Sequence, residues 1–112
     1  MDLTPCLQFV YLPIFERTAG HLSDEVLRRL EQELLSIPRR GDTIKGTGGF
    51  RKIRVALSGR GKSGGARVVY YYVERQARVY FVLAYTKNVQ ENLTTGQQKI
   101  LRALAKALDG EP

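Results

Sequence analysis

Apolar residues recur at helical spacing in two segments of the chain. In the first segment, Ser23 is a candidate N-cap, two acidic residues follow it, and apolar positions repeat three to four residues apart until Pro38. In the second, Thr95 and Gln98 have the spacing of a capping box. The apolar stripe after that box consists of Ile100, Leu101, Leu104 and Leu108. The pattern therefore predicts one helix before Pro38 and another at the C-terminal end.

β-Branched and aromatic residues gather in short runs that are typical of strands. These runs cover residues 7–15, where Pro13 favours an edge position or an early stop, and residues 50–55, 67–73 and 78–85. In the second run Lys52 and Arg54 alternate with apolar residues, so the two cations share one face. The predicted order is strand, helix, three-strand meander and C-terminal helix. This order predicts an α+β fold, a small antiparallel sheet with its helices on one face and the other face open.

Length and composition limit the classes of protein that fit. The 112 residues, 43% of them hydrophobic, suffice for one core, so residues 1–112 are expected to form a single domain. The single Cys6 has no internal disulfide partner, and no Cys/His pair has zinc-ligand spacing. The apolar runs are far shorter than the roughly 20 residues of a membrane span. We expect a cytoplasmic protein that needs no metal or cofactor and has no membrane partner.

The positive charge is concentrated in one third of the chain. The net charge is +7, yet no acidic residue occurs between Asp42 and Glu74. That stretch contains seven basic residues, Lys45, Arg51, Lys52, Arg54, Arg60, Lys62 and Arg67. The remaining 11 basic residues are balanced by the 11 acidic ones. An acid-free stretch of this length favours a polyanionic partner, most commonly nucleic acid, over a surface tuned only for solubility.

Lys52, Arg54 and Arg67 are the strongest candidates for a phosphate site. A hairpin through the Gly-rich residues 59–65 would bring Arg67 onto the strand beside the other two cations. Such a cluster suits a phosphate whose oxygens gain negative charge in a transition state. Three consecutive tyrosines at residues 70–72 are expected mainly to fill the core, and one of their rings could stack on a base.

Three segments in this order resemble the HigB-type branch of the RelE/ParE toxin superfamily. They are GTGGFRKIRV at residues 46–55, GGARVVYY at 64–71 and LAYTKN at 83–88, within a likeness that runs over about residues 9–108. The resemblance implies a RelE-like fold and the toxin of a type II toxin-antitoxin system. It also implies a ribosome-dependent endonuclease that cleaves mRNA in the ribosomal A site. The implied partners are a HigA-like antitoxin with a DNA-binding domain, the ribosome with its mRNA, and operator DNA only as the toxin-antitoxin complex.

The resemblance also indicates which residues act. Lys52 and Arg54 match two basic residues on one strand, Arg67 matches an arginine on the next, and Lys87 matches a lysine at the end of the sheet. Asn88 stands where RelE-like members often have arginine. No tyrosine follows Tyr85, so the identity of the general acid stays open.

These matches define a mechanistic hypothesis. Lys52 acts as general base on the RNA 2′-OH, Arg54 and Arg67 bind the phosphate, and Lys87 is an auxiliary electrostatic or proton-donating group. The residues expected to contact RNA are Lys45, Arg51, Arg60, Lys62 and Tyr85. Two other functions fit the same pattern, a ParE-like gyrase inhibitor and a non-catalytic nucleic-acid-binding module.

Overall fold

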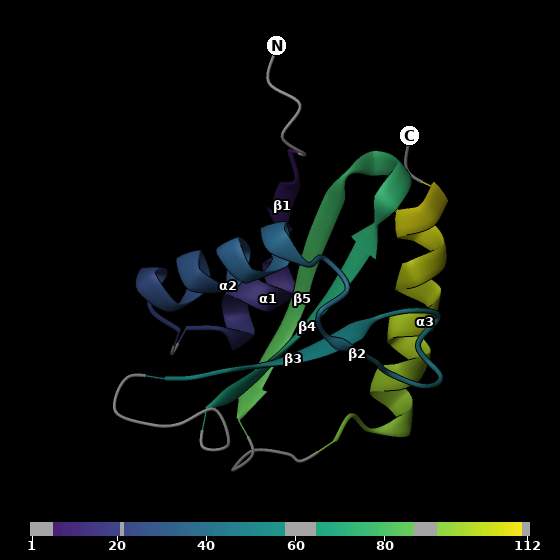
Figure 1. Cartoon of the computed structure of the whole chain (residues 1–112). Coiled ribbons are helices and arrows are strands. Elements are labelled where there is room, and N and C mark those ends of the chain that lie inside the picture. Colours follow the sequence, from purple (N-terminus) through teal and green to yellow (C-terminus); the bar gives the residue numbers. More distant parts are fainter. Residues whose placement is uncertain (1–5, 21, 58–64, 87–91, 111–112) are drawn as a thin grey trace.

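The computed structural model describes residues 6–20, 22–57, 65–86 and 92–110, which form one sheet with helices packed on it (Figure 1). The elements are β1 (Gln8–Tyr11), α1 (Pro13–Thr18), α2 (Asp24–Ser36), β2 (Asp42–Thr43), β3 (Arg51–Val55), β4 (Ala66–Val73), the 3-10 turn η2 (Glu74–Gln76), β5 (Arg78–Thr86) and α3 (Thr95–Gly110). The strand order is β1-β5-β4-β3-β2. The α+β class and the antiparallel meander from β3 to β5 confirm the prediction.

The N-terminal part differs from the predicted strand and helix in two ways. The first strand ends at Tyr11 because Pro13 opens α1, a helix that the sequence pattern does not predict. Proline suits the first helical position, since its φ is already helical and its missing N–H has no partner there. β1 also runs parallel to β5, so the sheet is mixed rather than wholly antiparallel. The two-residue strand β2 is a further addition, paired with β3.

Both long helices have the caps that their ends require. Ser23 Oγ accepts a hydrogen bond from the Val26 N–H at 3.2 Å, as predicted for α2. For α3 the prediction was wrong by one residue. Thr94 and Gln97 form the capping box instead, with reciprocal bonds of 3.1 Å to Thr94 Oγ1 and 2.9 Å to Gln97 Oε1.

The apolar face of α3 is also slightly rotated from the predicted stripe. Ile100 was assigned to that stripe, but its side chain is 67% exposed. The buried residues of α3 are Leu101, Ala105 and Leu108, which lie four and three residues apart. The sequence pattern missed Ala105 because a small side chain adds little to an apolar stripe.

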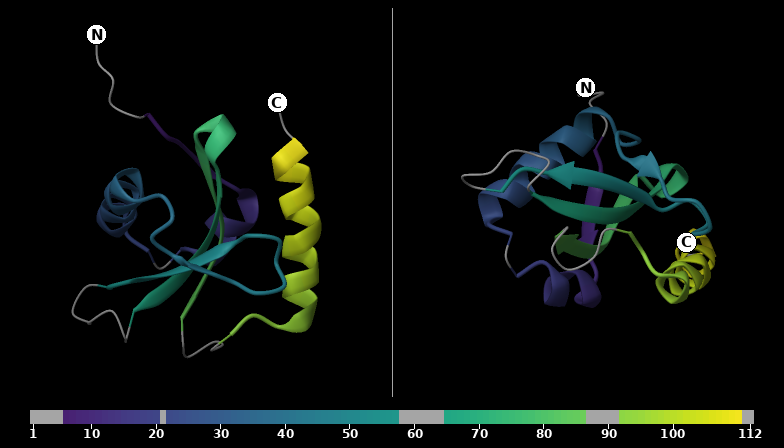
Figure 2. Two further views of the ribbon diagram at one scale, coloured as in Figure 1. Left: turned by 45° about the vertical axis from the view of Figure 1, so that its right-hand side comes forward. Right: turned by 90° about the horizontal axis from the view of Figure 1, so that it is seen from below.

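Helices cover both faces of the sheet, which corrects the prediction of one covered face and one open face. Residues of α1 and α2 share a core with Val68 and Phe81. Residues of α3 share a second core with Val69 and Tyr71 on the opposite face (Figure 2). β4 is buried along almost its whole length, as expected of a strand covered on both sides. The long helices α2 and α3 therefore pack their apolar stripes against opposite faces of the sheet.

The α3 face is covered at one end of β4. There, Tyr71 donates a hydrogen bond of 2.6 Å to Asp109 Oδ2, and the Gln76 side chain donates one of 3.1 Å to the Leu108 carbonyl. Arg67 lies four residues before Tyr71 in β4. Because side chains alternate between the two faces of a strand, Arg67 projects from the same face as Tyr71. The predicted cation cluster therefore shares its sheet face with α3. Within the described ranges, no helix combines the length and apolar character that crossing a membrane requires.

Candidate functional site

Side chains from three adjacent strands form a row on the α3 face of the sheet. Arg54 on β3 lies opposite Arg67 on β4, and Arg67 lies opposite Tyr85 on β5. Residues directly opposite in antiparallel strands share a face, with Cβ atoms about 4.5–5.5 Å apart. Lys52 lies two residues before Arg54 and projects from the same face. The structure thus brings Lys52, Arg54 and Arg67 together beside Tyr85.

Arg67 and Tyr85 are both buried, and each has a polar atom without a partner. Their side chains are 6% and 4% exposed. In the part of the chain that the structure describes, Arg67 Nη1 and Tyr85 Oη form no hydrogen bond. Burying a cation without a counter-charge is costly, and the like charge of Arg54 opposite it adds repulsion. An anion that enters this row would relieve both costs.

The environment of Tyr85 keeps its hydroxyl protonated. Burial raises the pKa of Tyr85 above its usual value, and the neighbouring positive charge of Arg67 only partly opposes this. At neutral pH the phenol is therefore a hydrogen-bond donor. The row therefore places a protonated phenol beside two arginines.

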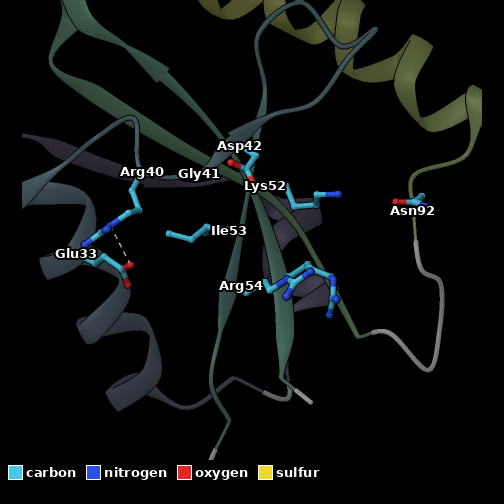
Figure 3. A pocket seen from close by; sticks show the side chains of 9 residues that line it. Glu33, Arg40, Gly41, Asp42, Lys52, Ile53, Arg54 and Asn92 are labelled. Atoms are coloured by element: carbon cyan, nitrogen blue, oxygen red, sulfur yellow. Dashed lines mark ion pairs between the residues drawn. The ribbon is translucent and has the colours of Figure 1, made fainter. Parts of the chain in front are cut away.

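A groove of about 600 Å³ opens beside this row (Figure 3). Its lining residues are Glu33, Arg40, Gly41, Asp42, Lys52, Ile53, Arg54, Arg67 and Asn92. Of the two acids, Glu33 forms an ion pair of 3.4 Å with Arg40 at one side of the groove. Sequence reasoning missed Arg40, Asp42 and Asn92. Arg40 and Asn92 lie outside the strands, and Asp42 begins the two-residue strand β2, which the sequence pattern did not predict. Their only signal is that Arg40 and Asp42 flank Gly41 in a turn.

The loop of residues 44–50 fixes where β3 begins. The Thr47 hydroxyl donates to the Ile44 carbonyl at 2.7 Å and accepts from the Phe50 N–H at 3.2 Å. Gly46 has a φ of 83°, which favours glycine, and its carbonyl accepts bonds of 2.9 and 3.1 Å from the Arg102 guanidinium of α3. These bonds explain the GTGGF part of the sequence structurally. They hold the strand that presents Lys52.

The other predicted site residues have different positions. Arg51 projects from the opposite face, where its Nη1 donates to the carbonyls of Gly41 at 2.7 Å and Arg39 at 3.2 Å. Lys45 is exposed on the loop before β3 and does not line the groove. Lys87, Arg60 and Lys62 lie outside the described residues.

None of the three consecutive tyrosines faces the groove. Tyr70 and Tyr71 are buried, in the cores on opposite faces of the sheet. Tyr72 packs against the α1 and α2 core, with the Arg39 guanidinium 5.1 Å from its ring centre. The expectation that these tyrosines mainly fill the core is confirmed for Tyr70 and Tyr71. As for metal ions, no group of three His, Cys, Asp or Glu side chains among the described residues is placed to hold one.

Comparison with known proteins identifies the family. The family model described as the RelE toxin of the RelE/RelB toxin-antitoxin system matches residues 16–111. The chain belongs to the RelE toxin family. This confirms the resemblance to the RelE/ParE superfamily, while membership of its HigB-type branch stays a prediction.

Solved structures of E. coli RelE and of one further protein have the same fold. A mutant of the E. coli toxin RelE in the free state is similar with a TM-score of 0.54 and 19% identity, over 76% of this chain and 87% of that one. The intact E. coli RelBE toxin-antitoxin complex is similar with a TM-score of 0.53 and 19% identity, over 72% of this chain and 96% of that one. A conserved hypothetical protein of Helicobacter pylori is similar with a TM-score of 0.54 and 14% identity, over 74% of this chain and 97% of that one. At these identities the likeness establishes the fold of this RelE-family chain.

Proposed function

We propose that this RelE-family chain cleaves mRNA in the ribosomal A site and thereby inhibits translation. The observation that carries the proposal is the buried Arg67, whose Nη1 has no partner among the described residues. It lies in a row with Arg54 and Tyr85, on the sheet face that also bears Lys52. Family membership supports a toxin, and this row supplies the donors that a phosphate needs.

The reaction uses a nucleophile that RNA itself carries. Lys52, in its neutral form, accepts the proton of the 2′-OH, and the resulting oxygen attacks the adjacent phosphorus. The bond from phosphorus to the 5′ oxygen breaks, which leaves a 2′,3′-cyclic phosphate and a 5′ hydroxyl. Lys87 is the proposed donor of the proton to the leaving oxygen.

The arginines act on the charge that develops at phosphorus. Arg54 and Arg67 donate to the non-bridging oxygens, which are most negative in the transition state. Because Arg67 is held in the sheet before RNA arrives, little reorganisation is needed at that moment. The protonated hydroxyl of Tyr85 contacts the RNA from the end of the row.

The remaining basic residues are proposed to bind the RNA backbone. Lys45 is exposed, beside the strand of Lys52, and we assign Arg60 and Lys62 the same role. Arg51 would bind RNA through donors other than its Nη1, which is bonded to two carbonyls. Each backbone contact should add about 0.7–1 to the slope of log affinity against log salt.

The proposed partners follow from the family. The E. coli RelBE structure contains a toxin with its antitoxin. We propose that this chain is likewise held inactive by an antitoxin, of the HigA-like type with a DNA-binding domain. It would bind the ribosome and mRNA when free, bind operator DNA only as the toxin-antitoxin complex, and act in the cytoplasm.

The deciding experiment is mRNA cleavage in a reconstituted translation reaction, with and without ribosomes. The parent protein is compared with Lys52→Ala and Arg67→Met, and with Arg29→Ala as a control for loss of an exposed cation. We expect ribosome-dependent cuts with cyclic phosphate ends, lost in the first two variants and kept in the control. Intact mRNA with binding retained would favour a nucleic-acid-binding module, and inhibited DNA supercoiling would favour a ParE-like gyrase inhibitor.

A further inference from the structure

Two carboxylates line a groove whose other charged residues suit phosphate. Its charged lining among the described residues consists of the cations Arg40, Lys52, Arg54 and Arg67 and the acids Glu33 and Asp42. Glu33 forms an ion pair of 3.4 Å with Arg40. Asp42 is exposed, and its side chain forms no ion pair or hydrogen bond with another described residue. A carboxylate without a partner weakens phosphate binding beside it, so its place in the groove requires another explanation.

The fold holds Asp42 beside Lys52. Asp42 begins β2, and its Cα partner in β3 is Lys52, so β2 stops short of Arg54. Residues directly opposite in antiparallel strands project from the same face of a sheet. In Figure 3 Asp42 and Lys52 lie on neighbouring strands at the groove. The free carboxylate therefore belongs to the face that bears the proposed phosphate donors.

The turn before β2 fixes the position of Asp42. The Tyr70 hydroxyl accepts a hydrogen bond from the Gly41 N–H at 2.9 Å, and Arg51 donates to the Gly41 carbonyl at 2.7 Å. A Cβ at Gly41 would lie 2.9 Å from the Lys52 carbonyl oxygen, so only glycine fits this close approach. Asp42 thus follows a glycine that is packed against the backbone of Lys52. Its Cα is held in place before any ligand arrives.

The chemistry of a carboxylate limits what Asp42 can contact in RNA. An ionised carboxylate accepts hydrogen bonds and donates none, and phosphate oxygens also only accept. Adenine, cytosine and guanine each carry an exocyclic amino group, whereas uracil carries only carbonyl oxygens in those places. A carboxylate therefore attracts the first three bases and repels uracil. The 2′-OH also donates, but every ribonucleotide has one, and the proposed mechanism assigns the reacting one to Lys52.

We propose that Asp42 is a specificity-determining residue, whose carboxylate accepts a hydrogen bond from the exocyclic amino group of the base directly 5′ to the cut. That nucleotide carries the 2′-OH on which Lys52 acts, and Asp42 lies directly opposite Lys52. Codons with adenine, cytosine or guanine at this position are then cleaved faster than codons with uracil. The inference rests on the proposed function, because it names the substrates that the same site prefers.

The test compares reconstituted translation reactions in which only the base 5′ to the cut differs. The cut is first mapped, and that position then carries adenine, cytosine, guanine or uracil. A further mRNA carries purine ribonucleoside there, which is adenosine without its amino group. Cleavage rates are measured for the full-length parent protein, Asp42→Asn and Asp42→Ala. Asp24→Asn is the matched control, because it makes the same change at an exposed acid of α2 that does not line the groove.

We expect the parent protein to cleave the adenine mRNA about tenfold faster than the uracil and purine mRNAs, because these two lack the hydrogen bond to a charged group. In Asp42→Ala the three rates should agree within about threefold. Asp42→Asn should also lose the preference against uracil, because its amide can donate to a uracil carbonyl. Asp24→Asn should keep the preference of the parent. Each ratio is taken within one protein, so a smaller folded fraction does not alter it.

An equal loss of cleavage on every mRNA in both Asp42 variants would overturn the inference, because Asp42 would then act in a step common to all codons. An unchanged preference against uracil in Asp42→Ala would overturn it as well, because the ribosome or another residue would then read the base. A parent protein that cleaves all the mRNAs at one rate keeps the proposed function and loses this inference. A parent protein that cleaves none of them loses both.

Discussion

The two faces of the sheet hold arginine side chains in different ways. On the α1 and α2 face, Arg51 Nη1 donates to two backbone carbonyls, and beside it Tyr70 both donates and accepts. On the α3 face, Arg67 is buried with an unpartnered Nη1 in the described structure, opposite the like charge of Arg54. The first arrangement stabilises a turn. The second stores an unfavourable interaction that a ligand can relieve, which is typical of a functional site.

Substitution of Arg67 should show the difference between the two faces most clearly, because it should lower activity without lowering stability. In Arg67→Met we expect cleavage on the ribosome to fall about 10²–10³-fold, as for loss of one preorganised donor to a developing charge. The free energy of unfolding should stay equal or rise, because a buried guanidinium whose Nη1 has no partner among the described residues is replaced by an apolar side chain. Single-turnover cleavage and urea unfolding measure the two effects. A parallel loss of stability would show that Arg67 is structural.

Tyr70→Phe should have the opposite result. Removal of the hydroxyl leaves the buried Gly41 N–H and the Pro38 carbonyl without their partner, so stability should fall by about 1–3 kcal/mol. Because Tyr70 lies on the other face of β4, cleavage by the folded protein should change less than about threefold. Urea unfolding gives the first quantity and cleavage at 25 °C the second. A large loss of activity at full stability would contradict the division between the faces.

Alkaline pH should loosen α3. Burial and the hydrogen bond to Asp109 raise the pKa of Tyr71 to about 12. The folded state then holds the phenolic proton more tightly than the unfolded chain, so this stability is present below about pH 10 and is lost as pH rises towards 12. In Tyr71→Phe the fall in melting temperature over this range should be smaller than in the parent. Identical pH profiles would show that this bond does not hold the helix.

The smallest effect is expected at the exposed ion pair of α2. Arg29 and Glu25 are 3.1 Å apart, but their side chains are 68% and 76% exposed. Arg29→Ala should cost no more than about 0.5 kcal/mol and should leave cleavage unchanged. Thermal unfolding and the cleavage assay provide the check. A change in cleavage here would mean that positive charge acts from outside the groove.

Much of the fold follows from local pattern. Ser23 caps α2 as predicted, and alternation along β3 correctly groups Lys52 with Arg54. Prediction was less accurate where weak local signals compete. Two threonines in sequence can each open a capping box, and the structure uses Thr94 rather than Thr95. The short α1 was missed because its residues are apolar enough to continue a strand.

The candidate site was only partly predictable for a different reason. Charge and alternation indicate which residues could bind phosphate. They place Arg51 and Arg54 on opposite faces of β3, but they do not show that Arg51 is bonded within the protein. That Arg51 is bonded to carbonyls depends on the turn before β2, which Tyr70 anchors from another strand. The positions of Arg40 and Asn92 in the groove depend equally on distant contacts.

The sequence by itself determined the features that neighbouring residues control. These are the Ser23 cap of α2, the alternation of β3, the meander and the concentration of positive charge before Glu74. Only the tertiary structure decided that Arg67 lies between Arg54 and Tyr85, that α3 shares their face, and that β2 stops short of Arg54. Strand register and helix docking arise from packing between residues far apart in the chain, so no local pattern specifies them.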